Sequence, residues 1–180
     1  MKVSLNWLKE YVDIALPPDK VSEVLTDIGL EVEGMEEVES VKGGLEGIVV
    51  GQVKECGKHP NADKLSLTKV DVGADELLQI VCGAPNVAAG QKVLVAAVGT
   101  TLYSPEGEAW KIKKGKIRGE VSEGMICAED ELGLGDDHSG IIVLPEDVTV
   151  GIAARDYYQI ETDYAYEIGL TPNRSDATNH

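Results

Sequence analysis

Apolar residues recur at helical spacing near the start of the chain and then alternate as in a strand. A short helix is expected after Ser4, whose hydroxyl is a favourable N-cap. A second helix is expected to end near Gly29, because the residues before it form an i, i+3, i+4, i+7 apolar stripe. The apolar positions of the two helices are Leu5, Trp7, Leu8, Tyr11 and Val12, then Val21, Val24, Leu25 and Ile28. Segment 30–38 alternates apolar residues with glutamates, and we expect the apolar side chains of residues 1–40 to be core.

From Gly43 onward glycine is frequent and the apolar runs shorten to strand length. The candidate strands, separated by glycine, proline, asparagine and aspartate, lie at residues 47–53, 65–72, 77–84, 91–99, 110–119, 124–128 and 140–145. One helical turn is expected in segment 128–134. Many short strands at close spacing predict a small sandwich or barrel.

The candidate strand at 65–72 helps to choose between these two architectures. Its apolar positions are Leu65, Leu67, Val70 and Val72. The pattern slips by one residue near Thr68, which predicts a β-bulge there. Because small closed barrels need strongly bent strands, the sequence favours an OB-type barrel over an immunoglobulin-like sandwich.

The fold expected from these patterns has two parts. Residues 1–40 and 151–180 are expected to pack together as one small α+β domain, with a strand at 163–170 and a turn at 171–176. Residues 41–150 are expected to form an all-β OB-fold barrel inserted between these ends, since domain termini often lie close together. We also expect the chain to stop inside the small domain rather than at a natural C-terminus, because its last residues carry no terminating signal.

Charge is distributed unevenly along a chain whose net charge is −16. Residues 41–118 hold 11 basic and 8 acidic residues, whereas residues 119–150 hold 9 acidic and no basic residue. The overall charge argues against a nonspecific nucleic-acid binder, because phosphates would be repelled. Segment 41–118 is the one place where a polyanion could dock, and the acidic segments are explained as solubilising surface.

The densest cationic stretch, KIKKGKIRG, carries Lys111, Lys113, Lys114, Lys116 and Arg118. A kink at Gly115 would let Ile112 and Ile117 both point inward and most of the cations outward. One interpretation is a strip that contacts an RNA backbone, and the other is an edge strand that its lysines protect against aggregation. Aromatic stacking surfaces in the central segment are limited to Tyr103 and Trp110, so any RNA contact is expected to be mainly to phosphates.

A second candidate lies in the stretch HPNADK, residues 59–64, where a strand ends and the next begins. Proline, asparagine and aspartate are natural turn formers, so a structural role in the turn is one interpretation. The other is RNA contact, because loops beside the strand face of such barrels are a common nucleic-acid surface. The candidate RNA-contacting residues here are Lys58, His59, Asn61 and Lys64.

Other chemistry finds little support in the sequence. The three cysteines, Cys56, Cys82 and Cys127, are widely spaced and odd in number, which indicates reduced thiols rather than a disulfide framework. No paired metal-ligand spacing, phosphate-binding loop or nucleophile motif occurs, so we expect no catalytic residue, no metal site and no cofactor here. Segment 134–140, with two aspartates and a histidine, is interpreted as a solvated turn. No apolar run approaches the roughly 20 residues of a membrane helix, so no membrane partner is expected.

Two sets of segments carry a family resemblance. The barrel-type tRNA-binding domain, known from stand-alone tRNA-binding proteins and some methionyl-tRNA synthetases, resembles this chain at HPNADKLSLTKVDVG, LQIVCGAPNV and GQKVLVAAVG. The N-terminus of bacterial phenylalanyl-tRNA synthetase β subunits resembles it, in order, at MKVSLNWLKEYVD, LTDIGLEVEG, KIRGEVSEGMICAEDELGLGDDHSGIIVLPED and LTPNR. After TPNR this chain reads SDATNH, which departs from the Asp and Leu-Ser common in that family.

The resemblance implies an OB-type barrel inserted into a small domain. It also implies a parent enzyme in the cytoplasm, an α2β2 heterotetramer that charges tRNA(Phe) with phenylalanine using ATP and magnesium. In that family the aminoacylation centre lies on the α subunit, so this segment is expected to lack it. Two functions stay open: an RNA-binding appendage of the synthetase, or an assembly module that positions other domains or the α subunit without binding RNA by itself.

Overall fold

The structure is a computed structural model that describes residues 1–104 and 107–170. Its contacts divide the chain into two compact units. The terminal unit comprises Met1–Ser40 together with the chain from Glu161, and the barrel unit comprises Val41–Ile160. The turn expected at 171–176 lies outside the described residues. Within the described part of the chain, every helix is too short or too polar to cross a membrane.

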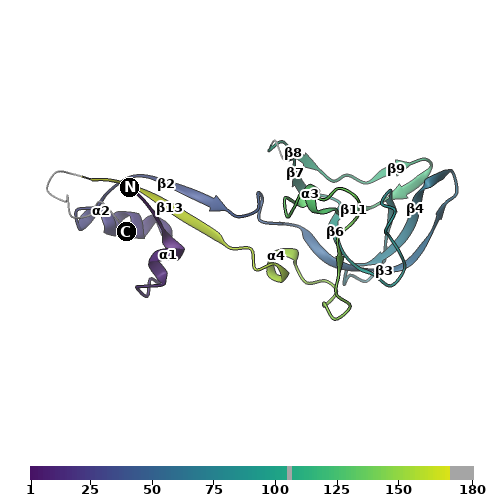
Figure 1. Cartoon of the computed structure of the whole chain (residues 1–180), viewed down its shortest axis with the longest axis horizontal. Helices are drawn as coiled ribbons and strands as arrows, with labels where there is room; N and C mark the ends of the chain where they lie inside the picture. The colour runs from purple at the N-terminus through teal and green to yellow at the C-terminus, as the bar shows by residue number, and fades with distance from the viewer. Residues whose placement is uncertain (105–106, 171–180) are drawn as a thin grey trace. The chain divides into compact units, whose positions relative to one another are not determined.

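In its described residues, the terminal unit has a three-stranded antiparallel sheet and two helices (Figure 1). Its elements are β1 (Lys2–Ser4), α1 (Leu5–Lys9), α2 (Pro18–Asp27), β2 (Glu31–Glu39) and β13 (Thr162–Gly169). Strand β13 is central, with β1 on one side and β2 on the other. Tyr166, in the middle of β13, is fully buried, and its hydroxyl donates to the Pro18 carbonyl at 3.0 Å. This bond ties the sheet to the start of α2.

Local side chains fix the first helix as the sequence predicts. The Ser4 hydroxyl accepts a hydrogen bond from the Trp7 amide at 3.0 Å, which caps α1. The same hydroxyl donates to the Asp163 carboxylate at 2.5 Å, and the Asn6 amide donates to that carboxylate at 2.9 Å. The N-terminus of the helix is therefore held by β13, a strand that lies far away in the sequence.

The barrel unit is built on one sheet whose described strand pairs are all antiparallel. Its strands are β3 (Ile48–His59), β4 (Ala62–Asp71), β5 (Leu78–Cys82), β6 (Lys92–Ala97), β11 (Gly124–Ile126) and β12 (Val143–Leu144). The order is β11-β6-β3-β4-β5, and β12 pairs with the other end of β6. The free edge of β5 meets β10 (Glu120–Ser122) and the residue after it, because the Glu123 amide donates to the Gln79 carbonyl at 2.8 Å. The sheet is thus nearly closed, which is consistent with an OB-type tRNA-binding domain.

Strand β6 is buried on both faces. Along β6, Val93 and Val95 pack in one hydrophobic cluster, and Leu94 and Ala96 pack in the other. All four are fully buried. A strand covered on both faces reads as a continuous apolar run, which explains why this strand was clear in the sequence.

The bulge predicted in β4 is wrong. Thr68 and Val70 both point to the core and are 0% exposed, and the pairing of β4 with β5 is regular from Ser66 to Val70. The register shift lies instead on the partner strand, between Val53 and Glu55 of β3. Thr68 occupies a core position because its hydroxyl donates to the Ile80 carbonyl at 2.8 Å, so no polar group is left unpaired.

The segment predicted as one strand at 110–119 is two strands in two small sheets. Residues Ala109–Lys111 form β8, which pairs with β7 (Thr101–Tyr103), and Gly115–Ile117 form β9, which pairs with β10. The break lies at residues 112–114, as a kink near Gly115 requires. Ile112 is buried, but Ile117 is 40% exposed, so the expectation that both isoleucines point inward is wrong. The unit is completed by α3 (Glu129–Leu132), the helical turn expected there, and α4 (Ala154–Tyr157).

Candidate nucleic-acid interface

His59 holds the turn between β3 and β4. Its ring is only 4% exposed. Nδ1 accepts a hydrogen bond from the Asn61 amide at 3.1 Å, and Nε2 lies 3.0 Å from the Ile117 carbonyl. An amide can only donate and a carbonyl can only accept, so this pairing requires a neutral ring with its proton on Nε2. The side chain of His59 therefore serves the structure of the turn and is not open to a ligand.

Asn61 extends the same contact to the next turn. Its side-chain Nδ2 donates to the Arg118 carbonyl at 3.2 Å. Arg118 and Gly119 form the two-residue turn between β9 and β10, and both have positive φ angles, 52° and 102°. These are the angles that turns of type I′ need. The hydrogen bonds from His59 and Asn61 thus join two turns that are distant in sequence, and they present the side chain of Arg118 to solvent.

The cationic residues predicted at 111–118 are all exposed. We call residues 111–118 the lysine loop. Lys114 pairs with Glu123, with 2.6 Å between Nζ and Oε1, and this hydrogen bond is the main cause that lowers the pKa of Glu123. Within the described part of the chain, no ion pair forms at the other cations of the loop, which are Lys111, Lys113, Lys116 and Arg118.

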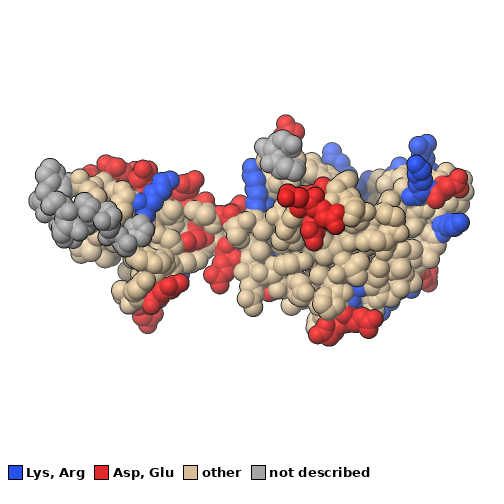
Figure 2. Space-filling view, viewed as in Figure 1, with Lys and Arg blue, Asp and Glu red and all other residues tan. Residues whose placement is uncertain are grey.

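Lys58 and Lys64, on either side of the β3–β4 turn, are exposed and likewise without an ion pair among the described residues. The bonds from His59 and Asn61 bring this turn against the lysine loop. Figure 2 shows Lys and Arg side chains over the end of the barrel where Figure 1 labels β9 and β4. The structure therefore gathers two cationic segments that the sequence left separate.

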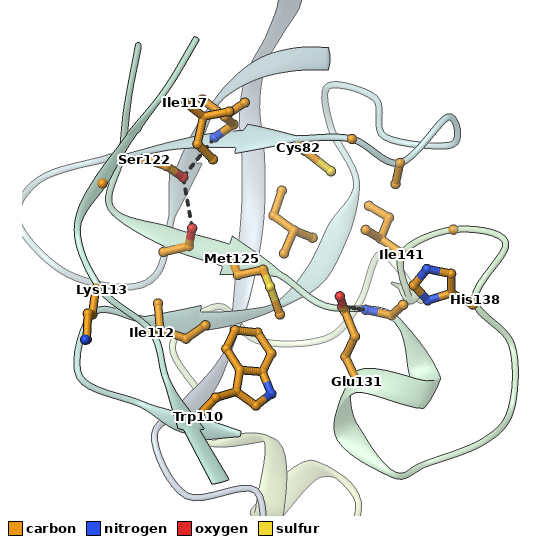
Figure 3. A pocket seen from close by; sticks show the side chains of 18 of the residues that line it. Cys82, Trp110, Ile112, Lys113, Ile117, Ser122, Met125, Glu131, His138 and Ile141 are labelled. Atoms are coloured by element: carbon orange, nitrogen blue, oxygen red, sulfur yellow. Dashed lines mark hydrogen bonds between the residues drawn. The ribbon is translucent and has the colours of Figure 1, made fainter. Parts of the chain in front are cut away.

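A pocket of about 660 Å³ lies beside the lysine loop. Figure 3 shows Trp110, Met125 and Glu131 around the same space. Its walls come from four parts of the barrel unit, at residues 81–85, 110–117, 122–131 and 138–141. In the sequence, Trp110 is one of two aromatic residues of the central segment and His138 is part of a solvated turn, and no local pattern connects them. The only local signal in the sequence is a tryptophan directly before the lysines.

The buried cysteines offer no reactive thiol. Burial is the largest cause that raises the pKa of Cys82, and burial raises the pKa of Cys127 to about 12. Both thiols therefore stay protonated near neutral pH, and a thiol in that state is a poor nucleophile. Among the residues that the structure describes, no three His, Cys, Asp or Glu side chains gather to hold a metal ion.

A nearly closed antiparallel barrel with cations gathered at one end is typical of proteins that bind nucleic acid. The model of the family described as "Putative tRNA binding domain" matches residues 48–153, and the chain belongs to this family.

Whole-chain comparisons agree with the β-subunit resemblance seen in the sequence. The chain is 59% identical over 180 residues to the phenylalanine–tRNA ligase beta subunit of Bacteroides fragilis, and 54% identical over 176 residues to that of Pectobacterium atrosepticum. It spans only 22% and 21% of the length of these relatives, respectively. The expected similarity to these β subunits is therefore confirmed.

Among solved structures, a MetRS-related protein from Pyrococcus horikoshii matches with 27% identity and a TM-score of 0.41. The match covers 58% of this chain and 84% of that one.

Proposed function

We propose that the barrel unit binds tRNA through its backbone phosphates, as part of a phenylalanine–tRNA ligase. The observation that carries this proposal is the group of exposed cations without acidic partners in the described chain: Lys58, Lys64, Lys111, Lys113, Lys116 and Arg118. Lys58, Lys64, Lys116 and Arg118 lie around the two joined turns, and Lys111 and Lys113 continue the lysine loop, in a chain whose net charge is −16. Lys114 contributes less because Glu123 partly neutralises it. His59 and Asn61 act through the turns that they position.

The intact enzyme would charge tRNA(Phe) with phenylalanine, with ATP and magnesium as its cofactors. We assign that chemistry to other parts of an α2β2 heterotetramer in the cytoplasm, with the α subunit as the partner of this chain. We also propose that the chain ends form one α+β domain into which the OB barrel is inserted. The pairing of β2, from the N-terminal segment, with β13, from the C-terminal segment, supports this arrangement.

The second candidate function is an assembly module that does not bind RNA by itself. The specific observation in its favour is that the side chains of His59, which is buried, and Asn61, which is exposed, are both used in hydrogen bonds within the barrel unit. The acidic terminal unit also disfavours RNA, since residues 1–40 hold 3 basic and 10 acidic residues.

The two functions are separated by measuring tRNA binding to the whole chain by fluorescence anisotropy over a salt series. Electrostatic binding gives a slope of log affinity against log salt of about −0.9 for each neutralised phosphate. The test variant changes Lys111, Lys113 and Lys116 to Ala. The matched control changes Lys2, Lys9 and Lys20, in the terminal unit, to Ala and so removes the same charge.

We expect the loop variant to bind more weakly with a shallower slope, by about 0.9 per lost phosphate contact, and the control to change little. Equal weakening by both variants would mean that only net charge matters and would reject the lysine loop as the site. Absence of binding at low salt, where electrostatic attraction is strongest, would reject RNA binding and favour the assembly module.

A further inference from the structure

We infer that the pocket beside the lysine loop receives one unstacked nucleobase of the bound RNA, and that the phosphates next to this base lie on Lys111 and Lys113. This inference rests on the proposed function and adds a recognition step to it. Phosphate contacts orient an RNA but do not read it, whereas a pocket for a base can do so. The proposal depends on three properties of the pocket: its walls, its polar edge and its rim.

The walls suit a flat aromatic ring. Ile112, Ile126 and Ile141 are buried at 4–6% exposure and line the pocket, while the side chain of Trp110 stays 42% exposed at its edge. Met125 lies beside the indole (Figure 3). The volume of about 660 Å³ falls within the roughly 300–1,000 Å³ typical of sites for small molecules. An exposed indole next to an apolar wall offers the stacking surface that unpaired bases use.

The polar edge is the Glu131 carboxylate. Its Oε2 accepts a hydrogen bond from the Ala128 amide at 2.8 Å, which fixes the side chain. Its Oε1 receives no hydrogen bond from the part of the chain that the structure describes. An ionised carboxylate only accepts, so it selects a base edge that carries N–H donors. Guanine presents two adjacent donors, N1–H and the N2 amino group, whereas uracil presents a single N–H.

The rim of the pocket carries cations on one side and hydrogen-bonding side chains on the other. Lys111 and Lys113 line the pocket on the side of the lysine loop and are exposed without an ion pair among the described residues. Glu131 and His138 line the other side, where His138 Nδ1 lies 2.7 Å from an Asp130 carboxylate oxygen. Cations on one side and an acceptor on the other match a nucleotide whose phosphates stay outside while its base enters.

The test uses the fluorescence of Trp110 in the whole chain. The protein contains two tryptophans, and Trp7→Phe leaves Trp110 as the reporter. The probes are oligouridylates of about nine nucleotides, within the usual range of an OB-type site, with a central guanosine, a central uridine or a central abasic position. The three strands carry the same charge. We expect the guanosine strand to quench Trp110 and to bind about tenfold more tightly than the abasic strand, from stacking of one base.

Two substitutions test which side chains cause this difference in affinity. Binding of labelled strands to each variant is measured by anisotropy. Trp110→Ala should remove the difference between the guanosine and abasic strands but leave the salt slope unchanged. Glu131→Gln keeps an oxygen for the Ala128 amide and exchanges the free acceptor for a donor, so it should remove the preference for guanosine over uridine. Tyr11→Ala, which truncates an aromatic side chain of the terminal unit that is 69% exposed, is the matched control.

The outcomes distinguish this inference from the function on which it rests. Equal, salt-dependent binding of all three strands would overturn the base pocket and leave phosphate binding intact. A guanosine preference that survives in both the Trp110→Ala and Glu131→Gln variants would place the base elsewhere and would also overturn it. Failure of every strand and of tRNA to bind at low salt would reject the proposed function and this inference together.

Discussion

The two units differ in how completely they bury their apolar residues. In the barrel unit, β6 is covered on both faces, and core side chains of other strands, such as Val53, Val70 and Ile80, are 0% exposed. In the terminal unit, the core of the described residues consists of five buried side chains, Val3, Leu5, Val21, Tyr166 and Ile168. Tyr11 and Ile28 there are 69% and 61% exposed. A small unit with one thin layer of helix over a sheet has too little interior for all of its apolar residues.

This difference corrects the expectation that the apolar residues of positions 1–40 are core. The exposed ones in this segment are Tyr11, Val12, Leu16, Val24, Ile28, Met35 and Val38. Helical periodicity placed α2 correctly but could not say how much of its apolar face finds a partner. An amphipathic pattern therefore predicts an element more securely than it predicts burial.

The largest effect is expected from a substitution that destabilises the terminal unit alone. Tyr166→Ala removes the largest fully buried side chain and should cost about 4 kcal/mol of unfolding free energy. Each unit has one tryptophan, so Trp7 fluorescence, in a Trp110→Phe background, reports the terminal unit during urea unfolding. We expect the Trp7 transition to fall to lower urea and the Trp110 transition, followed in a Trp7→Phe background, to stay.

Tyr166→Phe is the control for this prediction. It removes only the hydrogen bond to Pro18 and should cost about 1 kcal/mol. A parallel fall of both tryptophan transitions in Tyr166→Ala would mean that the two units unfold as one and would contradict the comparison.

A smaller loss of stability is expected when a methyl group is added at a tightly packed glycine of the barrel. A Cβ added at Gly51 of β3 would lie 2.8 Å from Val95 and 2.9 Å from Val70, both of which are fully buried. Gly51→Ala should therefore cost about 2 kcal/mol, measured from the Trp110 unfolding transition. Gly57→Ala, on the same strand but with no atom within 4 Å of the added Cβ, should change stability by about 0.5 kcal/mol or less. Similar losses of stability in both variants would show that replacing any glycine of this strand is destabilising, whatever packs around it.

The third prediction concerns pH and the Asp163 contact in the terminal unit. Burial acts to raise the pKa of Asp163, but hydrogen bonds from Ser4, Asn6 and Tyr164 outweigh it and leave the pKa below its usual value. A lowered folded-state pKa gives stability that is present above the unfolded-state pKa of about 3.9 and is lost as pH falls through the folded-state value. The Trp7 unfolding midpoint should therefore fall with acid in the native chain.

Asp163→Asn should flatten that decline, since residue 163 then has no carboxylate to protonate. Asp137→Asn is the matched control, because hydrogen bonds from Ser139 also lower the pKa of Asp137, but this residue lies in the barrel unit. An unchanged acid decline in Asp163→Asn would assign the effect to other carboxylates of the terminal unit.

The smallest effect is expected at the ion pair of Lys114 and Glu123. Their side chains are 61% and 32% exposed, so the pair should contribute about 0.3 kcal/mol, measured by a double-mutant cycle in urea. Lys113→Ala, next to it and without an ion pair among the described residues, should leave stability unchanged. A coupling energy above about 1 kcal/mol would mean that the lysine loop is held by charge and is not a free surface.

The sequence predicted the elements whose causes are local. Ser4 caps its helix through its own hydroxyl. Strand β6 is recognisable in the sequence as a continuous apolar run because both of its faces are covered. It misplaced features that depend on distant partners. Thr68 is a core residue only because the Ile80 carbonyl accepts its hydroxyl, and the bulge sits on β3 rather than β4. The pocket likewise combines Trp110 with Glu131 and His138, which no local pattern connects.

The pairing of Glu39 with Thr162 makes the barrel unit the loop of a hairpin formed by β2 and β13. In an unfolded barrel, closing that hairpin would join residues separated by about 120 residues of free chain, and loop-closure entropy opposes this. The folded barrel joins its own ends through the bridge between Val49 and Ala153, which leaves at most about 20 residues between the bridge and the hairpin and lowers the entropic cost by about 1.5 kcal/mol or more. A folded barrel therefore favours closure of the terminal unit, and because such coupling is reciprocal, a closed terminal unit favours the barrel by the same free energy; the chain's connectivity couples the two folding events.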